Sequence, residues 1–103
     1  MAMAMSLTVT FSAQVYSVET IKKAAYRLSD LMSVDIRPSG DEIVCVVHFP
    51  SLQSEEDCQR GAAALRNEVL DQDLRSVVAK ETEAVRNAVL AYAFSKTGLQ
   101  GGD

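Results

Sequence analysis

Apolar residues occupy both alternating sets of positions in the stretch Asp41–Phe49. If this stretch is a strand, its two faces carry Ile43, Cys45, Val47 and Phe49 on one side, and Val44, Val46 and His48 on the other. A strand that is apolar on both faces is typical of the middle of a sheet covered on both sides. We therefore expect this stretch to be the central strand, with the rest of the chain packed against its edges and faces.

Two further segments alternate with a period of two. Residues 7–15 place apolar side chains at odd positions and polar ones at every even position, which predicts a strand with one solvent-exposed face. Residues 32–37 alternate in the same way and predict a short second strand. The turn signal Pro38–Gly40 folds it back as a hairpin, since Pro presets φ and Gly accepts a positive φ. Pro50 is expected to end the central strand.

Helical spacing predicts three helices. The first begins at the N-cap Ser17 and carries an apolar stripe as far as Leu28. The second begins at the N-cap Ser54, where three acidic residues complement the helix dipole. Polar residues 71–73 then interrupt the stripe, and one helix from 54 to 95 would be about 63 Å long. We therefore expect a break at 71–73, followed by a third helix that stops near Gly98.

The predicted order is β-α-β-β-α-α, an α+β fold in which helices pack a small antiparallel or mixed three-stranded sheet. A right-handed crossover places the third strand between the first and the second, as at the start of a ferredoxin-like fold. The strand at 7–15 then has an open edge. At 103 residues the chain is expected to form one domain over 1–98, with 99–103 as a flexible tail.

Charge and composition exclude several classes of partner. The formal charge of −4 and the scattered basic residues argue against nucleic acid and against anionic lipid. The sequence has no apolar run long enough for a membrane span and no signal-peptide pattern at its start. Cys45 and Cys58 form no CxxC motif, so we interpret them as buried thiols in a reducing compartment. A cytoplasmic location is the expectation.

The residue pattern contains no convergent catalytic or metal-binding set. His48 is the only histidine, and on a strand it points away from Cys45, so the two cannot share an ion or act as a nucleophile–base pair. No glycine-rich phosphate loop follows a strand. We expect no cofactor, no metal and no catalytic residue, and an enzyme that uses His48 or Cys45 is the weakest alternative.

The end of the last predicted helix, Ala91–Phe94, is apolar almost all round. Such a pattern is typical either of core or of a docking surface, and core is the preferred interpretation. Glu83 and Arg86, three residues apart on the same helix, indicate a solvated face.

Two stretches resemble the HxsD family of the His-Xaa-Ser system. They are YSVETIKKAAYRLSDLMSVD, which begins at Tyr16, and LDQDLRSVVAKETEAVRNAVLAYAFSKT, which begins at Leu70. A signature of that family reads roughly Leu-Leu-Asn-Asp-Tyr-x-Leu-Arg-Glu. The positions that match it are Asp71, Leu74 and Arg75, and those that depart from it are Leu70, Gln72 and Ser76.

The resemblance implies an accessory protein encoded beside two radical-SAM maturation proteins and a precursor with His-Xaa-Ser repeats, with no assigned catalytic residues. We expect it to bind the precursor peptide, a radical-SAM maturase, or both. An open strand edge can accept an added peptide strand, and the helix junction is a second surface. The residues expected at these surfaces are Leu7, Val9, Phe11, Asp71, Leu74 and Arg75. The alternative is a homodimer in which this edge pairs with the same edge of a second copy, and the dimer serves as a structural scaffold.

Overall fold

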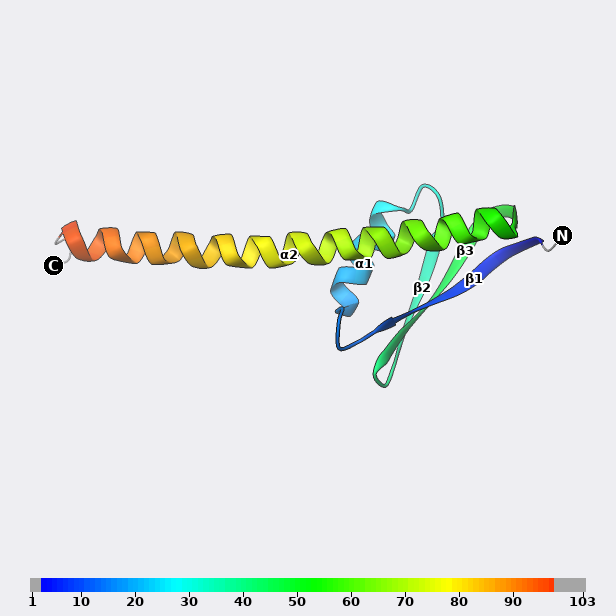
Figure 1. Cartoon of the computed structure of the whole chain (residues 1–103), viewed down its shortest axis with the longest axis horizontal. Helices are drawn as coiled ribbons and strands as arrows, with labels where there is room; N and C mark the ends of the chain where they lie inside the picture. Colours follow the sequence, from blue (N-terminus) through cyan, green and yellow to red (C-terminus); the bar gives the residue numbers. More distant parts are fainter. Residues whose placement is uncertain (1–2, 98–103) are drawn as a thin grey trace. The chain divides into compact units, whose positions relative to one another are not determined.

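The computed structural model describes residues 3–97. Its elements follow in the order β1 (Met3–Ser12), α1 (Val18–Arg27), β2 (Ser33–Ser39), β3 (Glu42–Ser54) and α2 (Glu55–Thr97) (Figure 1). The chain divides into two compact units, one covering Met1–Asp73 and the other beginning at Leu74, and each is described by itself. The tail expected at 99–103 lies outside the described residues, and the single domain over 1–98 stays a prediction.

The three strands form one open sheet in the order β1-β3-β2, with both pairs antiparallel (Figure 1). The α+β class and the central position of the third strand are therefore confirmed. The hairpin between β2 and β3 turns at Gly40, whose φ of 59° suits a residue without a Cβ. The turn chemistry of the sequence was thus sufficient to locate the hairpin.

The predicted ends of β1 and β3 are wrong. β1 begins at Met3 and stops at Ser12, because residues 13–15 form a turn. β3 continues through Pro50 to Ser54. Beyond His48 it no longer pairs with β2, and its register with β1 shifts. A proline is tolerated in that stretch because irregular pairing does not require the N–H that proline lacks.

The helix α1 begins at the predicted N-cap. The Ser17 hydroxyl oxygen accepts a hydrogen bond from the backbone N–H of Thr20 at 3.1 Å, which satisfies one of the N–H groups left open at a helix start. Tyr16, just before the cap, packs edge-to-face on Phe11 of β1 with ring centroids 5.7 Å apart. The cap and this ring contact fix the point at which the chain leaves the sheet and enters the helix.

The predicted break at 71–73 is wrong, because α2 is a single helix through these residues. The segment contains neither Gly nor Pro, so polar side chains interrupt the apolar stripe without interrupting the backbone. The Gln72 amide also donates to the Glu68 carboxylate at 2.9 Å, one turn earlier, a pairing that supports a helix. The break was expected because a helix of about 63 Å would be too long for one compact domain. The chain instead divides into two units after Asp73.

The core of the first unit lies on one face of the sheet. Alternate residues of β3 enter it together with residues of β1, α1 and α2; its members include Val9, Ile21, Ile43, Cys45, Val47, Leu65 and Val69. On the other face of β3, Val44 and Val46 are half-buried and His48 is exposed. Within the described residues of the first unit, the expectation that both faces of β3 are covered is therefore wrong. Val44 and Val46 are shielded by cross-strand neighbours on the sheet.

The helix α2 supplies a matched pair of leucines for testing this core. Leu65 is fully buried, whereas Leu70 is 46% exposed. Replacing Leu65 by Ala removes buried methyl groups and leaves a cavity, so we expect the free energy of unfolding to fall by about 2–5 kcal/mol. Leu70→Ala, the same chemical change in the same helix, is expected to cost less than about 1 kcal/mol. Urea denaturation of the full chain measures both, and equal losses would contradict this core.

Candidate functional site

The outer edge of β1 is an open strand edge in the part of the chain that the structure describes, because β1 pairs only with β3. Beside its end, the Ala13 N–H donates to the Asp41 carbonyl oxygen at 2.8 Å. Hydrogen-bonded and non-hydrogen-bonded pairs alternate along an antiparallel ladder. The backbone groups of Phe11, Val9 and Leu7 therefore point toward β3, as far as the register shift between Ala4 and Ser6.

The backbone N–H and C=O groups of Ser6, Thr8 and Thr10 consequently point away from β3, into the open edge. Their side chains are exposed and lie on the uncovered face of the sheet. A second strand laid against β1 would therefore form its hydrogen bonds with these residues. β1 also lacks Pro, Lys and every other charged residue, the features that usually protect an edge from pairing.

The three β1 residues predicted for partner binding point into the core instead. Val9 and Phe11 are only 1% and 7% exposed, and Leu7 is half-buried against the same cluster. These side chains hold the strand in place, and a partner at the edge would meet neighbouring residues. The alternation in the sequence already separated the apolar side chains from the polar side chains of this strand. Which residues direct their backbone groups outward was identifiable only from the register of pairing.

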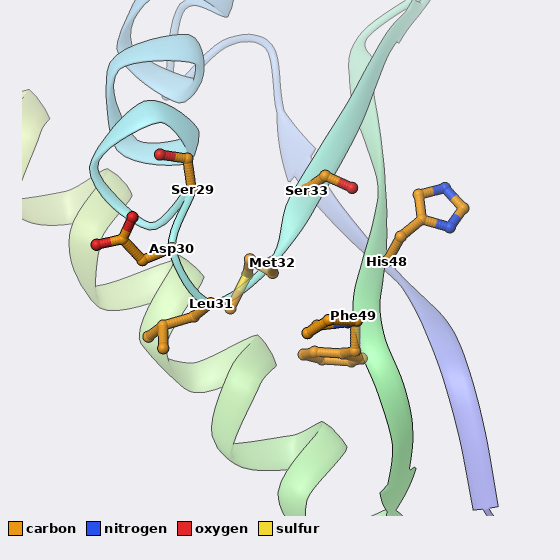
Figure 2. A pocket seen from close by; sticks show the side chains of 8 residues that line it. Ser29, Asp30, Leu31, Met32, Ser33, His48 and Phe49 are labelled. Atoms are coloured by element: carbon orange, nitrogen blue, oxygen red, sulfur yellow. The ribbon is translucent and has the colours of Figure 1, made fainter.

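A second surface feature lies where β2 begins, on the side of β3 away from β1. Two hollows of about 220 and 370 Å³ share walls formed by the α1–β2 loop and by β3 around Phe49 and Pro50. Figure 2 shows the Phe49 ring directed toward Leu31 and Met32, with His48 directed to the opposite side of β3. The larger hollow is at the lower end of the range for small-molecule sites, and its walls are largely apolar.

Gly61 of α2 forms part of the wall of the larger hollow. A Cβ placed on Gly61 would come within 2.7 Å of two Phe49 ring carbons. The glycine within this helix thus has a packing reason, the close approach of the ring.

Catalytic and metal-binding chemistry has few candidates here. Within the described residues, no three His, Cys, Asp or Glu side chains are grouped to hold a metal ion. His48 is exposed on one face of β3, while Cys45 is fully buried on the other, which confirms that the two point apart. Burial raises the pKa of the Cys45 thiol to about 11, so the thiolate needed for nucleophilic attack is disfavoured.

The second predicted surface lies along α2. Asp71 is half-buried in the first unit, and Leu74 and Arg75 are exposed at the start of the second. Close to Asp71, the Glu68 carboxylate lies 3.8 Å from the Arg27 guanidinium of α1. Partner binding by these predicted residues stays a prediction.

Comparisons with known proteins identify one family. The family model described as His-Xaa-Ser system protein HxsD matches residues 11–100. No curated protein and no solved structure matches the chain. In the part of the chain described, no helix is long and apolar enough to cross a lipid bilayer. The family match covers all of α1, β2, β3 and α2, so the resemblance stated from two stretches is confirmed over nearly the whole chain.

Cys45 offers a pH-dependent test of the core geometry. Its pKa is higher in the folded than in the unfolded chain, so the folded state retains the thiol proton longer. Stability from this group is complete below about pH 9 and is lost as the pH rises toward about 11, by up to about 3 kcal/mol. Urea denaturation at pH 8 and pH 10.5 should show a larger loss for the natural chain than for Cys45→Val, which lacks this thiol and keeps every other titratable group. Equal losses would contradict a desolvated thiol.

Proposed function

The chain belongs to the HxsD family of His-Xaa-Ser system proteins, and from this premise we propose that it is a non-catalytic accessory protein that binds the precursor peptide of such a system. The observation that supports this most directly is the unprotected edge of β1. Extended peptides bind to such edges by adding a strand. A radical-SAM maturase that acts on the peptide is the second expected partner.

The geometry of the edge favours an extended segment over a folded surface. Ser6, Thr8 and Thr10 present outward backbone groups at every second residue. An added strand can form main-chain hydrogen bonds with each of them. In an extended His-Xaa-Ser repeat, the His and Ser side chains lie on the same face of the strand. On the open face of the sheet they would lie beside the Thr8 and Thr10 hydroxyl groups.

A backbone substitution tests the edge directly. Thr8→Pro removes an outward N–H, and edge strands tolerate proline. We expect this variant to bind a synthetic His-Xaa-Ser repeat peptide at least about tenfold more weakly by calorimetry, since a hydrogen bond is lost and a ring intrudes. Thr8→Val keeps the N–H and is the matched control, with expected affinity near that of the natural chain.

Two controls separate a loss of peptide binding from a folding defect and from binding to a maturase. Both variants should retain a single cooperative thermal transition. Equal peptide affinity for Thr8→Pro and the natural chain would contradict binding at this edge. If the natural chain binds the maturases but no peptide, the accessory role is retained and the peptide-binding role is lost.

The non-catalytic assignment has its own test. His48 is exposed and lies outside any group of metal-ligating side chains among the described residues. We expect His48→Ala to leave modification of the precursor by the complete system unchanged, as measured by mass spectrometry of the product. A loss of modification with normal folding and normal partner binding would indicate a reactive role for this imidazole.

A homodimer through the same edge is the competing function. Two copies of β1 can pair antiparallel about a two-fold axis, which is the usual symmetry of a dimer, and that arrangement leaves little room for a peptide. Light scattering with and without the repeat peptide distinguishes the two. A dimer that persists in excess peptide, and that Thr8→Pro dissociates, would favour the scaffold.

A further inference from the structure

The part of the β1 edge that can accept a strand is short and has two defined ends. At one end, the Ser12 carbonyl oxygen already accepts the backbone N–H groups of Val15 and Tyr16, at 3.1 and 3.0 Å. At the other end, the pairing of β1 with β3 shifts its register just before Ser6. Complete outward pairs of N–H and C=O groups therefore remain from Ser6 to Thr10, a window for five residues of an added strand.

The two core-facing residues inside this window differ in burial. Val9 is only 1% exposed although the edge beside it is open, so its flank is already closed and leaves room for a small side chain. Leu7 is half-buried and packs against the core cluster, so part of its side chain can still cover an added apolar group. The window thus offers one narrow and one open apolar position on the core side of the sheet.

A His-Xaa-Ser repeat meets this window with a mismatch of periods, because the repeat has three residues and a strand alternates its faces every two. Any five residues from two joined repeats place one His, one Ser and one Xaa on the open face. That face therefore cannot select the alignment. The two core-facing positions receive a different pair in each alignment, either Xaa and His, Ser and Xaa, or His and Ser, so the core side is the selective one.

We propose that the β1 edge binds two consecutive repeats antiparallel to β1 in the single alignment Xaa-Ser-His-Xaa-Ser; this inference rests on the proposed peptide-binding function. Antiparallel pairing continues the pattern of the sheet. Only this alignment keeps the imidazole off the apolar core side, where its N–H would lose water without gaining a partner. It also sets the small Ser beside Val9 and an Xaa side chain beside Leu7.

The alignment fixes the position of the repeat along the edge and the class of peptide that fits. The intact His-Xaa-Ser unit places its His opposite Thr8 and its Ser opposite Ser6, and the Xaa of the preceding unit lies opposite Thr10 on the open face. The Xaa inside the intact unit is the one that meets Leu7. The preferred peptide therefore carries an apolar Xaa in the second of two joined repeats, whereas the Xaa of the first repeat is free to vary.

Calorimetry with the end-blocked peptide His-Val-Ser-His-Val-Ser tests the alignment. Replacing the second Val by Asp should weaken binding to the natural chain at least about tenfold, because a carboxylate would be placed against Leu7. The same replacement of the first Val, which lies opposite Thr10, is the matched control and should change the affinity less than about twofold. Equal losses for the two replacements, or a larger loss for the first, would overturn the alignment.

A double-mutant cycle assigns the contact to Leu7. In the natural chain, replacing the second Val by Ala should weaken binding about threefold or more, and in Leu7→Ala this loss should largely disappear. The loss for the first Val should be the same in both proteins. Each protein is compared with itself across the peptides, so a general weakening in Leu7→Ala cancels. An undiminished loss for the second Val in Leu7→Ala would overturn the contact.

A series of one, two and three Val-containing repeats tests the length of the window. Two repeats should bind at least about tenfold more tightly than one, because they fill the window. A third repeat should add only about twofold, since it offers one more equivalent alignment. A steep gain from the third repeat would overturn the window. No binding by any of these peptides would remove the proposed function together with the alignment, whereas binding that is indifferent to the two Val positions would overturn the alignment alone.

Discussion

Burial of one face of β3 under α1 and the first part of α2 is the contact on which the first unit depends. Ile43, Cys45 and Val47 are at most 2% exposed and belong to one cluster with residues of both helices. A fully buried aliphatic side chain contributes about 1.5–3 kcal/mol. Exposed ion pairs such as Arg37–Asp35 contribute about 0–1 kcal/mol. One apolar layer between sheet and helices therefore holds this unit together.

The helices pack on only one face of the sheet, and this explains where the proposed partners would bind. Both helices contribute to the same side of the sheet, so among the described residues the opposite face keeps its threonines and serines exposed. β1 is an edge strand held by inward side chains, while every second backbone group remains directed outward. The residues that stabilise the strand and those that would meet a peptide thus alternate along it. A change at Thr8 can affect binding with little effect on the core.

The helix α2 combines two different uses of an apolar stripe. In the first unit, Cys58, Ala62, Leu65 and Val69 are buried in the core. From Leu74 onward a new stripe begins that the second unit leaves exposed. Polar residues 71–73 mark the change between the two stripes, and the helical backbone runs through them unbroken. The predicted core at the end of this helix is wrong for Ala91–Ala93, which are exposed.

Local chemistry in the sequence determined the type and order of the elements up to α2. The Ser17 cap, the turn at Gly40 and the alternation in β1 each depend on residues a few positions apart. The family was likewise recognisable from short stretches. Only the tertiary structure decided that β3 continues past Pro50, that one face of the sheet is uncovered by the described residues of the first unit, and that Thr8 rather than Val9 presents its backbone at the edge. These features depend on strand register and on neighbours distant in the chain, which the period of a local pattern does not specify.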